Sequence, residues 1–208
     1  MELNFKIKKA DSNFEIRNTN LQSFKKKGFP NKKNEEWKFT DLEKIISDNF
    51  KELNNRSFKT NKPKKINLGF DHNSIVVVNG KLSSFDFKFE KFYQNNFVPV
   101  KELDLNYHLN FSENNNSNSM QNLNTALYES GFSLNIEEGY KFKKPIVFFN
   151  YFTGDFKNKI INNSEIIKMS KDSQATVIEY LVDATKGKYF KNTFKCFDIQ
   201  DNASLNYY

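Results

Sequence analysis

Two stretches of the sequence are versions of one another: Asp172-Ser173-Gln174-Ala175-Thr176-Val177 and, further along, Asp201-Asn202-Ala203-Ser204-Leu205. Each starts with an aspartate and places a small alanine at the turn that precedes a β-prone run. A repeated unit of one turn and one strand is typical of a solenoid, in which each coil stacks on the previous one. The repeat therefore favours a β-helix, with a β-sandwich and a β-barrel as the alternatives.

The residues around this repeat also indicate β structure. From residue 132 onward, short runs rich in Ile, Val, Phe and Tyr alternate with Gly, Asp and Asn, which is typical of strands joined by turns. The predicted strands are residues 132–136, 145–152, 160–169, 175–182, 190–199 and 203–208. Short strands and frequent turns suit all three β architectures, so only the repeat distinguishes them.

A small helical domain is predicted at the amino-terminal end. Residues 14–27 have a helical pattern that Gly28 would end, and Pro30 prevents its continuation. Thr40 and Glu43 have the spacing of a capping box, in which each side chain satisfies a free backbone amide. A second helix is therefore predicted to start there.

Trp37, the only tryptophan, lies just upstream of the predicted cap. Because an indole has a large apolar area and one donor, we expect a core residue that joins the two helices, with partner binding as the less favoured role. The polar, lysine-rich residues 54–65, with Pro63, are typical of a linker. The domain boundary is therefore placed near residue 62.

The middle of the chain predicts mixed structure. Residues 66–68 and 75–78 are predicted strands, and Asn79-Gly80 after the second is a dipeptide of tight hairpin turns. A Ser- and Asn-rich loop at residues 112–119 precedes a predicted helix that Gly131 ends. The predicted parts are residues 1–62, a helical domain; 63–131, a mixed connecting segment; and 132–208, the first coils of a β-helix. The predicted fold class is α+β.

The charge of the chain bears on its partners. The formal net charge is +7 and the pI is near 9.2, which would suit a nucleic acid or an anionic membrane if the basic residues were clustered. Only two of the 32 basic residues are arginines, whereas bidentate recognition of phosphates and bases favours arginine. The densest run, Lys25–Lys27 with Lys32 and Lys33, is expected to be a solvated face, with an acidic partner as the alternative. The sequence therefore predicts neither a nucleic-acid nor a membrane partner.

The cysteine content and the apolar runs predict a location. Cys196 is the only cysteine and cannot form an internal disulfide, and the amino-terminal residues lack the apolar core of a signal peptide. The longest apolar runs, residues 75–78 and 146–149, are far shorter than the roughly 20 residues that cross a bilayer. We expect a protein of the reducing cytoplasm.

No residue pattern predicts a bound metal. Neither His72 nor His108 has a Cys, His or carboxylate partner at ligand spacing. Cys196 lies between Phe194 and Phe197, and a lone cysteine is more often a packing residue than a thiolate ligand.

Catalysis is not predicted either. The chain has no glycine-rich phosphate loop, and no Ser or Cys nucleophile has a recognisable base. Glu137, Glu138, Glu165 and Glu179 could supply a carboxylate pair for sugar chemistry, since β-helices also act on polysaccharides. Isolated acids on strands are usually solvated, so we expect that these four are exposed and that the protein is not an enzyme.

Several short motifs occur in a fixed order along the chain. They are Gly28-Phe29-Pro30, Glu35-Glu36-Trp37-Lys38-Phe39-Thr40-Asp41-Leu42, Val78-Asn79-Gly80, Leu123-Asn124-Thr125-Ala126 with Gly131, Glu138-Gly139 and Lys144-Pro145-Ile146. The two turn repeats follow, with Glu179-Tyr180 between them and Tyr207-Tyr208 at the end. From about residue 20 to Tyr208, this order and spacing resembles the SufB/SufD family, the scaffold subunits of Suf iron–sulfur cluster assembly. Trp37-Lys38-Phe39-Thr40 favours the SufD branch.

The resemblance implies a right-handed β-helix and a non-catalytic scaffold. It implies a SufB-like scaffold and a SufC-like ATPase as partners in a hetero-oligomer, and an iron–sulfur cluster that only the full-length complex holds, transiently. In the family, the assembly site lies late in the β-helix and the ATPase contacts helices after it. We therefore expect a truncated, amino-terminal fragment with no catalytic, cofactor-binding or metal residues. The alternatives are a carbohydrate-active or carbohydrate-binding β-helix protein and a basic nucleic-acid-binding module.

Overall fold

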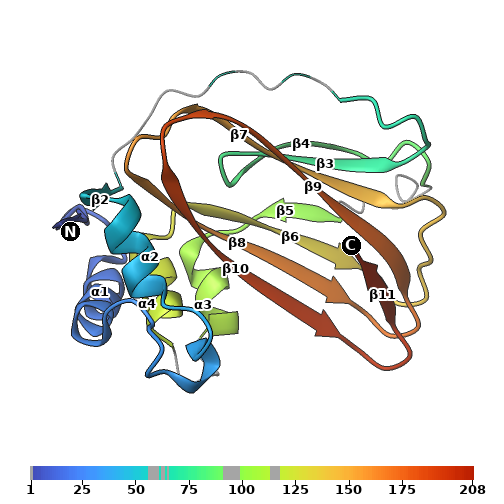
Figure 1. The fold of residues 1–208 in the computed structure, drawn as a ribbon. Coiled ribbons are helices and arrows are strands. Elements are labelled where there is room, and N and C mark those ends of the chain that lie inside the picture. Colours follow the sequence, from blue (N-terminus) through green and yellow to red (C-terminus); the bar gives the residue numbers. More distant parts are fainter. Residues whose placement is uncertain (1, 56–60, 62–63, 65, 91–98, 113–117) are drawn as a thin grey trace.

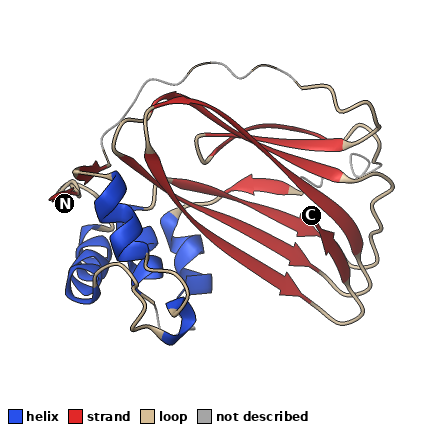
Figure 2. Cartoon of the chain, viewed as in Figure 1, coloured by secondary structure: helices blue, strands red, loops and turns tan. Residues whose placement is uncertain are grey.

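The computed structural model describes the chain except for residues 1, 56–60, 62–63, 65, 91–98 and 113–117. Helices gather at one end, and the strands form two open mixed sheets (Figures 1 and 2). The predicted α+β class is therefore confirmed. The predicted domain boundary near residue 62, and most of the predicted 112–119 loop, lie outside the described residues.

Helix α1 (Phe14–Lys27) has the predicted bounds. It ends because Gly28 adopts a φ of 71°, a backbone conformation that favours glycine, and the Gly28 amide donates to Phe24 O at 2.7 Å. The buried face of α1, with Leu21 and Phe24, packs against α4 (Ser119–Leu127). This pairing joins segments about 100 residues apart into one helical cluster.

Helix α2 (Leu42–Asn49) starts as predicted, but with a different cap. The N-cap is Asp41, whose carboxylate accepts a hydrogen bond from the Lys44 amide at 3.0 Å, so the predicted Thr40 capping box is wrong. A short 3-10 turn, η1 (Glu35–Trp37), comes just before this cap.

The strands form two sheets. Sheet A contains, in order, β1 (Glu2–Asn4), β2 (Glu52–Asn54), β8 (Lys159–Met169), β6 (Ser130–Ile136) and β5 (Val100–Glu102), and β10 (Tyr189–Ile199) also pairs with β8. Sheet B contains, in order, β11 (Ser204–Tyr207), β9 (Gln174–Lys186), β7 (Ile146–Asp155), β3 (Asn73–Val78) and β4 (Lys81–Asp86). All six strands predicted beyond residue 132 are confirmed, within a few residues at their ends.

From β6 onward the chain alternates between the sheets, with β6, β8 and β10 in sheet A and β7, β9 and β11 in sheet B. The pairs among these six strands are parallel. In the pair of β8 with β10, Tyr189 lies beside Lys159, and in the pair of β9 with β11, Ser204 lies beside Gln174. In both cases the second strand comes 30 residues later in the chain than its partner. One passage through both sheets is therefore 30 residues long at this end.

The repeat lies within this stack, but one residue out of the register that the sequence suggests. Asp172 (φ 58°) lies beside Asn202 (φ 56°), whose side-chain amide donates to Asp172 Oδ1 at 3.1 Å. Ala175 pairs with Leu205. The alignment of Asp172 with Asp201 is therefore wrong by one residue, and a one-residue shift turns every side chain of a strand to the opposite face.

Two local predictions of the connecting segment are wrong. Residues 66–68 form no strand; Ile66 and Leu68 pack on the outer face of sheet B against Phe149. Helix α4 ends without Gly131, which lies inside β6, where a Cβ would meet Ser164 O at 2.5 Å. Gly131 is thus needed for the close approach of two strands.

The predicted hairpin after residue 78 is confirmed. Asn79 (φ 55°) and Gly80 (φ 83°) connect β3 to β4, which pair antiparallel. Helix α3 (Leu105–Ser112) was not predicted from the sequence.

The apolar core has two main parts. One lies between the sheets and includes Phe132, Leu134, Phe148 and Ile167. The other fills the space between the helices and sheet A and includes Leu21, Phe24, Phe29, Ile46, Phe50, Leu53 and Ile160 of β8. Sheet A is therefore covered on both faces, by sheet B and by the helices.

Candidate functional site

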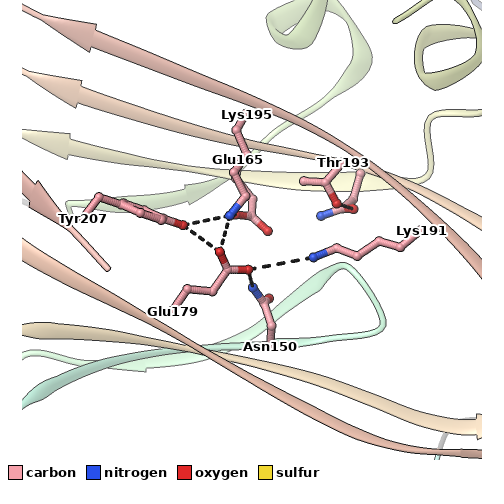
Figure 3. A network of polar contacts seen from close by, with 8 residues as sticks. Asn150, Glu165, Glu179, Lys191, Thr193, Lys195 and Tyr207 are labelled. Atoms are coloured by element: carbon pink, nitrogen blue, oxygen red, sulfur yellow. Dashed lines mark hydrogen bonds and ion pairs between the residues drawn. The ribbon is translucent and has the colours of Figure 1, made fainter. Parts of the chain in front are cut away.

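A polar network lies between the two sheets (Figure 3). Its side chains come from five strands: Asn150 of β7, Glu165 of β8, Glu179 of β9, Lys191, Thr193 and Lys195 of β10, and Tyr207 of β11. On β8, Glu165 has the same parity as Ile161 and Ile167, which belong to two separate apolar clusters. The network is therefore a polar layer within an otherwise apolar interior.

Lys195 is the centre of the network. Its ammonium group lies 3.1 Å from Glu165 Oε2, donates a short hydrogen bond to Glu179 Oε2, and donates to Tyr207 Oη at 2.8 Å. The Tyr207 hydroxyl in turn donates to Glu179 Oε2 at 2.9 Å. One ammonium group therefore connects β10 with β8, β9 and β11.

Glu179 has further partners on its second oxygen. Asn150 Nδ2 donates to Oε1 at 2.7 Å, and Lys191 Nζ lies 3.8 Å from the same atom. Burial alone would raise the pKa of Glu179, but the hydrogen bond from Lys195 and the charges of both lysines lower it below its usual value. Glu179 is therefore a carboxylate at neutral pH.

Glu165 is in a different position. Its side chain is 2% exposed, and among the described residues neither carboxylate oxygen accepts a hydrogen bond. The 3.1 Å contact with Lys195 satisfies the distance of an ion pair without the geometry of a hydrogen bond. The charge of Glu165 is therefore balanced by Lys195 alone among the described residues.

The charge of Lys195 depends on its neighbours. Burial alone would lower the pKa of its ammonium group, but the Glu165 charge and the hydrogen bonds with Glu179 and Tyr207 raise the pKa above its usual value. Burial, followed by the effect of the two carboxylates, raises the pKa of Tyr207, although Lys195 opposes this. At neutral pH, Glu179 is thus a carboxylate, Lys195 an ammonium group and Tyr207 a neutral phenol.

This arrangement is suited to holding strands in register. Glu165 and Glu179 both pair with the ammonium group of Lys195, so neither carboxylate is free to act as a general acid or base on a sugar. A glycosidase pair needs two carboxyl groups on opposite sides of a bound substrate, with no cation between them. The carbohydrate alternative is therefore not favoured.

A sequence signal for the network exists, but it requires knowledge of the 30-residue spacing between the paired strands β8 and β10. Residues 30 apart contact each other: Glu165 with Lys195, Asn163 with Thr193, whose hydroxyl donates at 2.7 Å, and Asn162 with Asn192, whose amide donates at 3.0 Å. Each is a polar pair on the adjacent parallel strands β8 and β10. The isolated acids predicted to be solvated therefore include one half of a buried pair.

The four predicted acids separate into two groups. Glu137 and Glu138 are exposed, as expected. The prediction that Glu165 and Glu179 are solvated is wrong, because their strands lie in the middle of the two stacks and point these side chains inward. The structure does not bring the exposed and the buried acids into one site.

His108 belongs to a second polar cluster, on the helical side of sheet A. It is fully buried, with Nε2 3.1 Å from Thr125 Oγ1 and Nδ1 2.8 Å from Ser164 Oγ, and its ring stacks on Tyr128. Burial, aided by the charge of Arg17, lowers the pKa of His108 to about 4. His108 is therefore a neutral link between α3, α4 and β8.

His72 lies in a different environment, on the outer face of sheet B. Its ring contacts the rings of Phe70 and Phe149 at centroid distances of 5.3 and 5.6 Å. In the described part of the chain, no three of the His, Cys, Asp and Glu side chains are placed to hold a metal ion. For Cys196, burial and then the charge of Asp198 raise the pKa of the thiol, which opposes thiolate formation.

The prediction that Trp37 is a core residue is wrong. Trp37 is half-buried and lies outside the apolar clusters of the described residues. The space between the helices is filled by phenylalanines: Phe24 and Phe29 are in edge contact at 5.0 Å, and Phe29 contacts Phe190 of β10 at 6.0 Å. Phenylalanine rings, and not the indole, therefore make the aromatic contacts of this cluster.

The comparison with models of known protein families gives a match. Residues 5–148, more than half of the chain, match the family model described as the SufBD protein N-terminal region. No curated protein matches the chain. Among the described residues, no helix is both long and apolar enough to cross a membrane.

Proposed function

The chain belongs to the SufB/SufD family, and on that premise we propose that it is a SufD-type, non-catalytic scaffold subunit of the Suf machinery for iron–sulfur cluster assembly. The observation that carries this proposal is the family match over residues 5–148. Trp37-Lys38-Phe39-Thr40 supports the SufD branch over the SufB branch. The proposed partners are a SufB-like scaffold and a SufC-like ATPase, in the reducing cytoplasm.

We further propose that residues 132–208 are coils of a β-helix. The parallel pairs that alternate between two sheets, and the 30-residue passage between stacked strands, support this fold. The stacked turns at Asp172 and Asn202 support it as well. In such a solenoid the Lys195 network would fix the register of successive coils, so that the scaffold is rigid.

The cluster in this proposal is cargo of the assembled complex. No residue of this chain is assigned as its ligand, because the described side chains offer no group of three ligands. The chain would contribute a rigid framework and surfaces for its partners. By itself, it is expected to hydrolyse no ATP and to bind no nucleic acid in a salt titration.

Co-purification tests the proposal. The chain is co-expressed within its full reading frame, because the family's contact with the ATPase lies beyond the β-helix, together with a SufB-like scaffold and a SufC-like ATPase from the same genome, and an affinity tag is placed on the ATPase. We expect all three to elute together and to separate as one species in size-exclusion chromatography. A complex of the two partners that excludes the folded chain would contradict the proposal.

A further inference from the structure

Residues 34–40 form an ordered surface segment that presents two aromatic side chains, and this feature does not depend on the proposed function. Phe39 is 88% exposed, more than any other large apolar side chain described as exposed. Trp37 is half-buried on the same segment. The Trp37 amide donates to Asn34 O and the Thr40 amide donates to Trp37 O, both at 2.8 Å.

A neighbouring contact holds the segment to the rest of the helical cluster. The Asn31 amide donates to Asn34 Oδ1 at 3.0 Å, and the Asn31 side chain donates to Glu43 Oε2 at 3.0 Å. The backbone of the segment is therefore fixed before any partner binds. A preorganised surface loses little conformational entropy on binding, which favours its use in recognition.

Trp37 also forms part of the wall of a pocket of about 630 Å³. The other walls come from Lys27 at the end of α1, from Pro30 after it, and from the N-cap of α4, Asn118. Glu35 and Glu36 of the same segment also line the pocket, so its wall is partly polar. This volume is enough for one large apolar side chain or for several small ones.

Single exposed apolar residues are ordinary on protein surfaces. Here an exposed Phe, a half-buried Trp and a pocket occur together on a fixed loop, which is the arrangement of an anchor site in a protein interface. Lys38 lies over the Phe39 ring at 5.3 Å from its centroid and pairs with Glu35 at 3.0 Å. The aromatic surface is thus bordered by charge.

The charge around this surface is basic. Residues 25–44 contain seven lysines and four acids, and Lys25, Lys26 and Lys27 are all exposed at the end of α1 beside the pocket. Lys32 and Lys33 are exposed on the connection to the segment. One of the four acids, Glu35, is already paired with Lys38. An acidic partner is therefore complementary to this border.

We propose that residues 34–40 and the adjoining pocket dock an acidic segment of a partner protein. An apolar side chain of that segment enters the pocket beside Trp37 and packs on Phe39, and its carboxylates meet the lysines at the end of α1. A membrane fits less well, because the site includes a pocket of about 630 Å³, which a flat bilayer surface cannot fill.

A displayed library of random 12-residue peptides tests this proposal on the intact chain. Selection on the wild type should enrich peptides that combine several Asp or Glu with a Leu, Ile or aromatic residue. Because Trp37 is the only tryptophan, its fluorescence reports binding of a selected, tryptophan-free peptide. Affinity should fall at least about tenfold with Phe39→Ser, and also when salt is raised from about 0.05 to about 0.5 M.

The controls separate docking from misfolding and from other partners. Phe39→Ser should fold normally, since the side chain is 88% exposed, and Tyr208→Ser, which removes a 75% exposed aromatic elsewhere, should bind like the wild type. Neutral or basic consensus peptides, no enrichment, or equal binding by Phe39→Ser would overturn the proposal. Phe39-dependent sedimentation with anionic phospholipid vesicles, or Phe39-dependent dimers in analytical ultracentrifugation, would overturn it in favour of a membrane or a second copy.

Discussion

Replacing Lys195 by methionine should destabilise the chain strongly. The substitution keeps the length and the apolar stem of the side chain and removes the ammonium group that lies between Glu165 and Glu179. Glu165, whose side chain is 2% exposed, then has no cation at ion-pair distance among the described residues. Breaking a buried ion pair on one side typically costs about 3–5 kcal/mol, and we expect a loss in this range.

Urea denaturation at neutral pH, followed by far-ultraviolet circular dichroism, measures this loss. With a slope of about 2 kcal/mol per molar, the midpoint should fall by about 2 M. Lys191→Met is the matched control, because Lys191 lies 3.8 Å from Glu179, a longer contact, and Glu179 keeps its pairing with Lys195 when Lys191 is removed. Its loss should be below about 1 kcal/mol.

A double variant decides whether the buried charge is the reason. Adding Glu165→Gln to Lys195→Met removes the uncompensated carboxylate, so the double variant should be more stable than Lys195→Met by about 1–3 kcal/mol. If the double variant is instead less stable, as independent losses would make it, the assignment of Glu165 as a carboxylate balanced by Lys195 is refuted.

Three further predictions concern single sites. Trp37→Ala should cost about 1 kcal/mol in urea unfolding, far below the roughly 3–5 kcal/mol of a buried tryptophan, and a loss in the higher range would restore a core role. Gly131→Ala places a Cβ 2.5 Å from Ser164 O and should cost about 1–3 kcal/mol; Gly139→Ala, at φ 69° with open space, should cost only about 1 kcal/mol. Because the pKa of His108 falls from 6.5 in the unfolded chain to about 4 in the folded one, the unfolded state binds more protons between these values, and stability should fall by about 3 kcal/mol as the pH drops from 6.5 to 4. His108→Gln should remove that dependence, and an unchanged pH profile would contradict it.

Element types could be predicted where the signal is local. The bounds of α1 follow from an apolar pattern and from Gly28, whose positive φ ends the helix within one turn. The hairpin at Asn79-Gly80 is equally local. By contrast, Gly131 resembles a helix stop in the sequence. In the structure it allows β8 to approach β6 closely, and no neighbouring residue indicates this role.

The polar network could not be predicted, because the sequence repeat suggests a strand register that is wrong by one residue. The sequence repeat aligns Asp172 with Asp201, 29 residues apart, whereas the stacked turns are 30 residues apart. With an offset of 29, the residue beside Glu165 would be Phe194, which in the structure points to the helical side and contacts His108. With an offset of 30 it is Lys195. A difference of one residue in the assumed spacing therefore decides whether Glu165 is predicted to be a solvated acid or part of a buried ion pair.

By itself, the sequence determined the order and kind of the main elements, the α+β class and the resemblance that the family match confirmed. These depend on backbone preferences and on side-chain patterns within a few neighbouring residues. Only the tertiary structure decided the partners of each strand, the burial of Glu165 and Glu179, and the exposure of Phe39 and Trp37. The reason is that strand pairing is set by the length of the chain between strands, and burial by what else fills the space, and neither quantity is encoded near the residue concerned.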